Sequence, residues 1–297
     1  MALASPRIGV LGNPDGYYVK ELCRAASGLC SLEVVSFETL GAGLYGDQFE
    51  AWDQSHRELQ SYDALVVRTM PWGTLEQIIF RIDALHALEA AGVRVVNSTS
   101  CLEIAIDKFR SLQLLQTKGL PIPETVACQN VTQAMEVFQK WGGRAVVKPM
   151  FGGEGRGIMR VEDDELAART FKTLVQLGAV IYLQEFIPHQ GCDIRVMVMQ
   201  DRTWAIRRSH PTDWRTNISR GAIAEPILLE PEWHDLATRA TAALGAQVAG
   251  VDLLIDQEGR PRILEINAVP GWKGLQEALG VDFAREFLRT LVEPTCK

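Results

Sequence analysis

Short apolar segments alternate with helical segments over the first 97 residues, and this alternation constrains the fold more than any other feature of the chain. Apolar runs of four to six residues occur at 7–12, 32–37, 64–67 and 93–96, and stretches with helical spacing occupy 17–29 and 74–91. Strands that alternate with helices are typical of a parallel sheet covered by helices. We therefore expect a small parallel α/β domain over residues 1–97.

A longer second part follows. Ser100, with Glu103 three residues later, forms the pattern of a helix N-terminus, so one helix is expected as far as Lys118. Strands are expected at 124–127, 144–148, 180–184, 195–199, 204–208, 250–255 and 262–267, with helices at 132–141, 163–177 and 231–244. The expected fold class is therefore α/β, with α+β character in this second part.

The charge and the cysteine pattern exclude several classes of protein. The net charge is −7, which disfavours a broad nucleic-acid-binding face, because such faces need clustered Lys and Arg. No apolar run approaches the roughly 18 residues of a membrane-spanning helix, and no signal peptide is expected. The six cysteines form no CxxC pair and no zinc-site spacing, which is typical of free thiols in a reducing compartment. We expect a cytoplasmic protein that binds neither nucleic acid nor membrane.

A lysine directly before a glycine-rich loop is the first group that carries chemistry. Lys148 ends an apolar strand, and four glycines crowd the next positions, at 152, 153, 155 and 157. Glycines allow backbone N–H groups to approach an anion closely. The pattern is neither a Walker A loop nor a Rossmann fingerprint, and a flexible hairpin turn is the alternative interpretation.

A second group lies in a predicted hairpin near the C-terminus. Glu265 and Asn267 alternate on one face of a strand, and pairing of residue 255 with residue 260 would place Asp252 opposite Ile263, diagonal to Glu265. Two carboxylates and an amide oxygen are hard ligands suited to Mg²⁺. A solvated hairpin face is the alternative, and a register shift of one residue would break this arrangement.

A third group is cationic. Arg215, Asn217 and Arg220 follow closely on Arg207 and Arg208. In an acidic protein such a cluster indicates a local site for a carboxylate or phosphate, because the guanidinium fork matches both. Surface salt bridges are the alternative.

In chain order these pieces resemble the ATP-grasp superfamily and, within it, the RimK-like glutamate ligases. The resemblance covers about residues 97–291 and runs through Asp107-Lys108, Lys148-Pro with its glycine loop, Gln184-Glu185-Phe186, Asp193-Ile-Arg195, Arg215-Thr-Asn217, Gly250-Val-Asp252 and Glu265-Ile-Asn267. The stretches 67–81 and 270–276 are most similar to ligases that add glutamate to tetrahydromethanopterin. The implied fold has the two ATP-grasp lobes after the N-terminal domain: 98–186, which carries a glycine lid, and 187–297, which carries the Mg²⁺-binding strands.

The resemblance also implies roles for individual residues. Asp252, Glu265 and Asn267 would bind Mg²⁺, for which Mn²⁺ could substitute, and Arg215, Asn217 and Arg220 would face the reacting carboxylate or the transferred phosphate. The ATP-binding residues would be Lys108, Lys148, Gly152, Gly153, Glu154, Gly155, Arg156, Gly157, Gln184, Glu185, Phe186, Asp193 and Arg208. The N-terminal domain and the cleft would choose the acceptor. Arg68 follows the strand residue Val67 at its carboxyl end, where open α/β sheets usually present groups that contact ligands.

Three hypotheses for function follow from this resemblance. The first is an ATP-dependent carboxylate–amine ligase that forms an amide through an acyl phosphate and adds L-glutamate to a small carboxylate acceptor such as a tetrahydromethanopterin-like cofactor. The second is a glutamate ligase that modifies a protein C-terminus. The third is a non-catalytic nucleotide-binding module. By analogy with its relatives, the protein would form a homo-oligomer, either a dimer or a tetramer.

Overall fold

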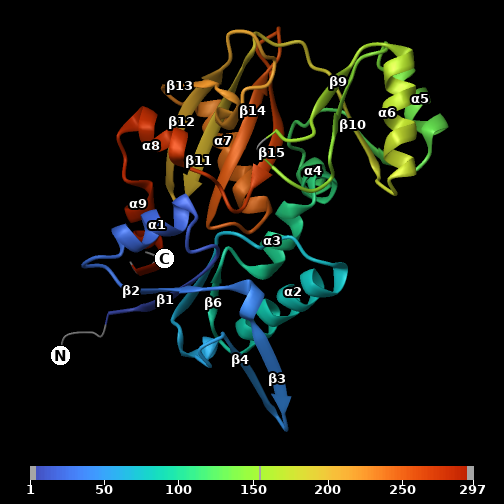
Figure 1. The fold of residues 1–297 in the computed structure, drawn as a ribbon. Helices are drawn as coiled ribbons and strands as arrows, with labels where there is room; N and C mark the ends of the chain where they lie inside the picture. Colours follow the sequence, from blue (N-terminus) through green and yellow to red (C-terminus); the bar gives the residue numbers. More distant parts are fainter. Residues whose placement is uncertain (1–4, 154, 293–297) are drawn as a thin grey trace.

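The N-terminal part is a parallel sheet with helices against it, as the alternation of apolar segments predicts. The computed structural model describes residues 5–153 and 155–292. The first sheet has the strand order β2-β1-β5-β6 and is parallel throughout. Its strands are β1 (Arg7–Leu11), β2 (Ser31–Val35), β5 (Ala64–Val67) and β6 (Arg94–Val96), and its helices are α1 (Tyr17–Ala25) and α2 (Leu75–Ala90). The expected parallel α/β arrangement is therefore present (Figure 1).

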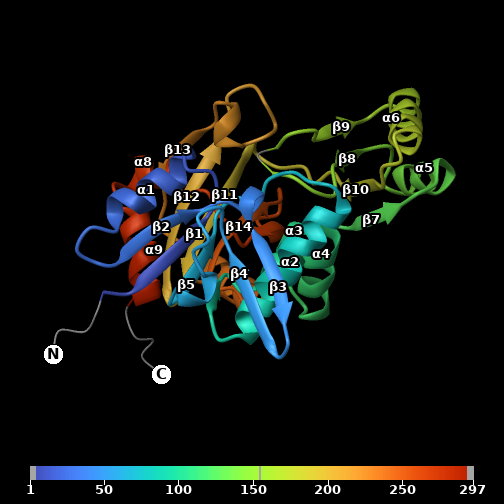
Figure 2. The same cartoon turned by 60° about the horizontal axis from the view of Figure 1, so that its bottom comes forward.

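One hairpin in this part is not predicted by the sequence pattern. Strands β3 (Gly41–Tyr45) and β4 (Gln48–Trp52) pair only with each other and project from the N-terminal sheet (Figures 1 and 2). The segment lacks a long apolar run, and Leu44 and Tyr45 at its tip are exposed. The pattern that identifies buried strands therefore could not find this hairpin.

The boundary helix is also different from the expectation. In place of one helix to Lys118, the chain forms α3 (Thr99–Ile106) and α4 (Lys108–Thr117). Asp107 between them is extended, with φ −95° and ψ 106°, and its carboxylate caps α4 by accepting from the N–H groups of Phe109 and Arg110. The N-cap of α3 is Ser98, not Ser100. An aspartate in mid-helix prefers to cap, because its side chain competes for backbone donors.

The second sheet is small and antiparallel. Its order is β7-β10-β8-β9, and two helices that contact each other pack against it. The elements are β7 (Thr125–Cys128), α5 (Val131–Lys140), β8 (Ala145–Lys148), β9 (Met159–Val161), α6 (Asp164–Gln176) and β10 (Ile181–Glu185). Phe138 and Phe171 are fully buried between the helices and the sheet, with ring centroids 6.4 Å apart.

The third sheet is antiparallel and five-stranded, in the order β13-β12-β11-β14-β15. Helix α7 packs on β11, β14 and β15, and α9 returns to lie beside α1 of the N-terminal part (Figure 1). The elements are β11 (Cys192–Met199), β12 (Arg202–Ser209), β13 (Ile223–Pro226), α7 (Pro231–Ala243), β14 (Val248–Ile255), β15 (Pro261–Asn267), α8 (Lys273–Leu279) and α9 (Phe283–Val292). Among the described residues no helix is long and apolar enough to cross a membrane.

Asn97 joins the first sheet to the third. Its buried side chain donates to the carbonyl oxygens of Val248 and Ala268, both at 2.6 Å, and its Oδ1 accepts from the N–H groups of Gln247 and Val248. One amide thus satisfies four backbone groups at the ends of β14 and β15. Because a buried backbone group without a partner is costly, Asn97 fixes how the two sheets meet.

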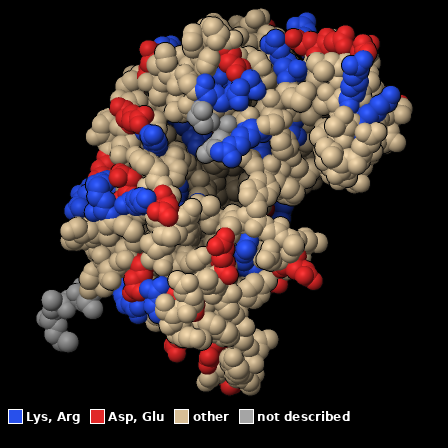
Figure 3. Space-filling model, viewed as in Figure 1, with Lys and Arg blue, Asp and Glu red and all other residues tan. Residues whose placement is uncertain are grey.

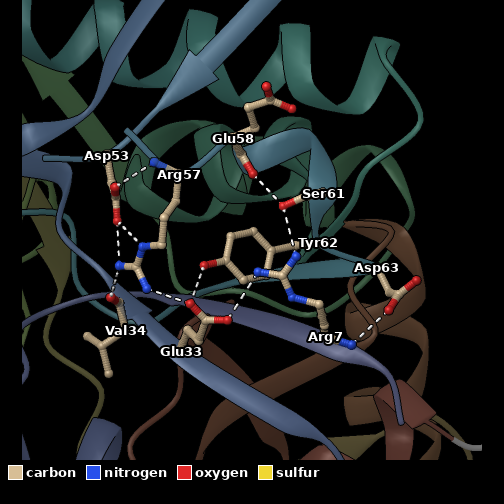
Figure 4. Close-up of polar contacts among 9 residues, drawn as sticks. All are labelled: Arg7, Glu33, Val34, Asp53, Arg57, Glu58, Ser61, Tyr62 and Asp63. Carbon is tan, nitrogen blue, oxygen red and sulfur yellow. Dashed lines mark hydrogen bonds and ion pairs between the residues drawn. The ribbon is translucent and has the colours of Figure 1, made fainter. Parts of the chain in front are cut away.

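A polar network holds the outer edge of the first sheet (Figure 4). Glu33 on β2 accepts hydrogen bonds from Arg7, Arg57 and Tyr62, at 3.1, 2.5 and 3.2 Å. Arg57 is held in turn by the buried carboxylate of Asp53. These pairs join β1 and β2 to the segment that follows β4, and we assign them a structural role.

Candidate functional site

The main cleft lies between the second and third sheets. Its space, including the part open to solvent, is roughly 760 Å³, and it is lined from β8, the glycine loop, β10, β11, β12, the 214–217 loop, β14 and β15. The molecule is hollowed on the face seen in Figure 3, with lysine and arginine side chains around the hollow. Eleven of the residues expected in the site line this cleft: Lys148, Gly155, Gln184, Glu185, Phe186, Asp193, Arg208, Arg215, Asn217, Asp252 and Glu265.

Lys148 is held in the cleft by the neighbouring strand. It lies opposite Tyr182 in the β8–β10 pairing, so Gln184 is on the same face, and the ammonium group donates to Gln184 Oε1 at 2.5 Å. Gln184 is fixed in turn, because its Nε2 donates to Thr125 Oγ1 at 3.2 Å. Burial lowers the pKa of Lys148 from 10.5 to about 8, although Glu265 opposes this shift. Gln184 thus orients the lysine.

Lys108 approaches the same region from the N-terminus of α4. Its ammonium group donates to the carbonyl oxygen of Gly152 in the glycine loop. Burial lowers the pKa of Lys108, and the charge of Glu265 counteracts it. The positive charge of Lys108 also contributes to the lowered pKa of Lys148. Lys108 thus reaches, from a distant segment, the glycine loop that follows Lys148 in the chain.

The glycine loop closes against the arginine-containing segment of the third sheet. A Cβ on Gly155 would lie 2.2 Å from Asn217 Oδ1, and its φ of +70° also favours glycine. Arg215 reaches the same loop and donates to the carbonyl oxygen of Ile158 at 3.3 Å. Of the other expected loop residues, Gly152, Gly153, Arg156 and Gly157 lie in the loop without lining the cleft, and Glu154 falls outside the described residues.

The expected pairing of the metal hairpin is wrong in register. Residue 255 pairs with Pro261, not with residue 260, and Leu253 pairs with Ile263. An irregularity between Asp252 and Leu253 then makes Asp252 pair directly with Glu265, which leaves Leu264 as an extra residue. The bulge shifts the pairing of β15 relative to β14 by one residue. Because Asp252 and Glu265 are then direct partners, their side chains lie on the same face of the sheet.

Asp252 is buried beneath the cleft and paired with two arginines. Its Oδ1 accepts from Arg195 Nη1 at 2.6 Å and lies 3.1 Å from Arg208 Nη2. Burial alone would raise the pKa of Asp252, but the two guanidinium groups more than offset this and lower it. The alternative of a solvated hairpin face is therefore wrong for this carboxylate.

Asp193 shares one of these arginines. Arg208 donates to both oxygens of Asp193, at 2.8 and 2.7 Å, in a bidentate pair, and Thr216 also donates to it at 2.5 Å. Both charged side chains are almost fully buried. The floor of the cleft is thus a rigid network of alternating charges, which gives it a preorganised shape.

Oxygen atoms suited to a cation remain available in this set. Glu265 Oε1 accepts a hydrogen bond from Asn267 Nδ2 at 3.1 Å. This bond uses the amide nitrogen of Asn267 and not its amide oxygen. Within the described chain, no hydrogen bond reaches Asp252 Oδ2 or Asn267 Oδ1. Three hard oxygen donors of this kind fit Mg²⁺, while no group of three or more His, Cys, Asp and Glu in the described residues could hold a metal by itself.

The 213–220 segment is organised by one carboxylate. Asp213 accepts from the Arg215 guanidinium through both its oxygens, at 2.8 to 3.1 Å, and Arg220 lies 3.5 Å away. The hydrogen bonds from Arg215 hold the pKa of Asp213 well below its ordinary value. Arg215 lines the cleft, whereas Arg220 is not among its lining residues.

An aromatic and cationic cluster forms the far wall of the cleft. The guanidinium of Arg160 lies 4.9 Å from the ring centre of Phe186, whose ring is 6.3 Å from Trp214 and 6.1 Å from His189. Glu185 next to it is turned toward β7, where its Oε1 accepts from the N–H of Glu124 at 2.9 Å. Flat rings with one nearby cation suit a planar, electron-rich ligand.

Several lining residues are not indicated by the sequence pattern. Trp214 and Thr216 lie within the cationic run, and His189 lies shortly after Phe186, but the sequence alone assigns no role to any of them. His189 lines the cleft, and burial lowers its pKa. Arg195 was noted only as part of a motif. Each of these residues lies close in sequence to Phe186, Asp193 or Asn217. Closeness in sequence to an expected site residue does not by itself assign a role.

Comparison with known proteins identifies the family. The profile of the RimK-like ATP-grasp domain matches residues 105–291. The chain belongs to the RimK-like ATP-grasp family. One relative, the tetrahydromethanopterin:alpha-L-glutamate ligase of Methanosarcina acetivorans, is 34% identical over 262 residues, with 78% of this chain and 81% of that protein covered. The ribosomal protein bS6–L-glutamate ligase of Escherichia coli O7:K1 is 32% identical over 237 residues, with 78% and 77% covered.

Solved structures share the fold. The ATP-grasp ligase PsnB complexed with minimal precursor, Mg and ADP superposes with a TM-score of 0.76 at 23% identity and covers 98% of each chain. The RimK domain protein ATP-grasp from Sphaerobacter thermophilus has a TM-score of 0.73 at 21% identity, with 97% and 100% covered. The predicted family and the mixed α/β fold are thus confirmed. As a RimK-like member, the chain is an ATP-grasp ligase, the enzyme class that joins a carboxylate to an amine with ATP.

Proposed function

We propose that this ligase adds L-glutamate to a small carboxylate acceptor of the tetrahydromethanopterin type. The observation that carries the proposal is that Lys148 and Glu265 line one cleft, while Lys108, from a distant segment, donates to the Gly152 carbonyl of the glycine loop beside it. The names of the two glutamate ligases that resemble the chain support glutamate as the amine.

In this proposal the ATP phosphates lie between the two lysines and under the glycine loop. Asp193 and Arg208 shape the floor for the sugar, and Phe186 borders the base. Phosphoryl transfer needs positioning and neutralisation of charge more than a protein nucleophile, so two amines and nearby guanidinium groups are suited to it.

The bond changes are those of amide formation. An oxygen of the acceptor carboxylate attacks the γ-phosphorus of ATP, the bond to the β-phosphate oxygen breaks, and ADP leaves. The glutamate nitrogen then attacks the acyl carbon, the carbon–oxygen bond to phosphate breaks, and the nitrogen loses a proton as the amide forms. Arg215 and Asn217, at the mouth of the cleft, would stabilise the charge that develops, and the loop around Gly155 would exclude water.

Asp252, Glu265 and Asn267 would hold Mg²⁺, which supplies Lewis-acid stabilisation of phosphate charge when it is bound. Arg195 and Arg208 both contact Asp252 Oδ1, so Oδ2 is the Asp252 oxygen that would bind the metal. That Mn²⁺ replaces Mg²⁺ is part of this proposal and follows from the same oxygen donors.

The experiment is a substrate screen that reads ADP release. L-glutamate is the amine, and pterin acids, small dicarboxylic acids and protein C-termini are the acceptors. The proposal expects release only with a small acid, and loss of it in Lys148→Ala and Glu265→Ala. Unchanged turnover in both variants would refute the site.

A protein acceptor is the second candidate, and the similarity to the bS6 ligase favours it. In that case mass shifts by multiples of one glutamate would appear on a protein, not on a cofactor. Nucleotide binding without ADP formation across the whole panel would instead indicate a non-catalytic module.

Three further expectations stay within the proposal. Free thiols on the five described cysteines support a cytoplasmic location. The boundaries 1–97, 98–186 and 187–297 follow the three main sheets. Exposed Trp72, Leu75 and Ile79 at the start of α2 support a homo-oligomer, which light scattering would test.

A further inference from the structure

Arg68 occupies the position where parallel sheets usually contact ligands. It directly follows β5, a central strand of the first sheet, at the carboxyl end. In open α/β sheets ligands bind at this edge. The side chain is nonetheless only 6% exposed, and no role in the ATP site accounts for it.

The guanidinium packs against two aromatic rings that also contact each other, with centroids 4.9 Å apart. Its Cζ is 4.4 Å from the ring centre of Trp272 and 4.9 Å from that of Tyr18. Its Nη2 donates to the carbonyl oxygen of Pro270 at 3.0 Å. Arg68 therefore contacts both α1 and the loop that leaves β15.

This buried cation lacks the partners that its chemistry requires. Within residues 5–153 and 155–292 no carboxylate pairs with Arg68, and its buried Nε has no hydrogen-bond partner. The ring nitrogen of Trp272, which stacks on it, is also buried without a partner. Burial lowers the pKa of Arg68 to about 10, so it remains charged at neutral pH.

Three other described arginines are equally buried. Arg81 donates to the carbonyl oxygen of Pro71 at 2.7 Å and, unlike Arg68, has no buried nitrogen without a partner. Arg195 and Arg208 are as buried as Arg68, and each is neutralised by an aspartate within 2.8 Å. Burying a charge without a counter-ion is costly. A counter-ion supplied by a ligand would explain why the described residues contain none for Arg68.

The location is close to the proposed reaction. Pro270 comes three residues after Asn267, and three residues span at most about 11 Å. An anion at Arg68 is therefore within reach of a substrate whose other end lies at the metal-binding strands.

We propose that Arg68, stacked on Trp272, is a subsite for a substrate carboxylate that does not react. That carboxylate belongs either to L-glutamate or to the acceptor, and the inference rests on the proposed function for this choice of substrates. The subsite would orient the substrate, and it would select acidic molecules over neutral analogues of the same size.

A purely structural role predicts something different. Arg94 is the matched control, because it also joins the first sheet to the rest of the chain by donating to backbone oxygens, those of Leu291 and Thr290, at 3.0 and 3.2 Å. It begins β6, at the opposite edge of the parallel sheet from Arg68. A structural arginine at position 68 should behave as Arg94 does.

The test is NMR of the full chain labelled with ¹⁵N-arginine, with Mg²⁺ and ADP present. The Nε–H signal of Arg68 is assigned by its loss in Arg68→Lys, and that of Arg94 by its loss in Arg94→Lys. We expect L-glutamate or glutarate to shift the Arg68 signal and leave that of Arg94 in place, whereas neutral glutaramide shifts neither. A response to glutarate alone assigns the carboxylate to the acceptor, and a response to glutamate alone assigns it to the amine substrate.

Two results would overturn the inference: no shift at Arg68 with either carboxylate at saturation, or equal shifts at Arg68 and Arg94. In addition, Arg68→Gln should weaken carboxylate affinity at least tenfold, while Arg94→Gln leaves it unchanged. The NMR readout needs no turnover. A shifted Arg68 in an enzyme that releases no ADP with glutamate therefore rejects only the proposed function, and turnover without a shift rejects only the subsite.

Discussion

Removing the charge of Lys148 should stabilise the ligand-free protein while abolishing its activity. Lowering a lysine pKa from 10.5 to about 8 corresponds to about 3 kcal/mol of unfavourable free energy in the charged form. Part of the side chain is exposed, so solvent screening makes this an upper value. Lys148→Met removes that cost but leaves Gln184 Oε1 without its donor, which costs about 1 kcal/mol. We expect the variant to be about 2 kcal/mol more stable at pH 7.

The sign of the pH dependence provides a sharper test. The unfolded chain keeps the Lys148 proton up to pH 10.5, whereas the folded chain loses it near pH 8, so the unfolded state binds more protons between these values. Between these pH values the free energy of unfolding of the wild type therefore rises with pH, and the contribution of Lys148 to this rise is about 2–3 kcal/mol from pH 7 to 10. The same contribution is lost when the pH is lowered through 8 and Lys148 takes up its proton in the folded state.

The assay is urea denaturation of nucleotide-free protein at pH 7 and pH 10, with Lys172→Met as the control, since Lys172 is an exposed lysine of α6. We expect the advantage of Lys148→Met at pH 7 to disappear by pH 10, and the control to match the wild type at both. A variant that is less stable at pH 7, or an advantage that does not change with pH, would show that Lys148 is not held as a destabilised cation.

Three further predictions concern the lid, the sheet junction and the metal ligands. Gly155→Ala should reduce ADP release at least about tenfold, because its Cβ would lie 2.2 Å from Asn217, whereas Gly142→Ala, with a similar φ and open space, should leave turnover intact. Asn97→Ala should lower the free energy of unfolding by about 3 kcal/mol or more, since four buried backbone groups lose their partner; a loss below about 1 kcal/mol in urea titrations would contradict this. Glu265→Gln should weaken Mn²⁺ binding at least tenfold in electron paramagnetic resonance titrations while ADP still binds, and unchanged affinity would exclude Glu265 as a ligand.

Much of the site could be predicted because its chemistry is local in sequence. Lys148 ends a buried strand directly before its glycine loop, and Glu265 and Asn267 share a face through the period of a strand. The first sheet follows from the alternation of apolar segments for the same reason.

The remaining features depend on contacts that no local pattern encodes. The bulge at Leu264 sets the partner of Asp252, and register is fixed by packing across the whole sheet. Arg195 matters because β11 lies beside β14, which brings it to Asp252 from 57 positions away. The break at Asp107 reflects competition between capping and helix propagation, which periodicity does not reveal.

The central claim is that two lysines from separate segments and an oxygen-rich metal site surround one nucleotide. Anomalous scattering from crystals grown with Mn²⁺ and a non-hydrolysable ATP analogue tests it most directly. We predict a manganese peak bounded by Asp252, Glu265 and Asn267, with the terminal phosphates between Lys108 and Lys148. A peak elsewhere, or phosphates out of reach of either amine, would contradict the account.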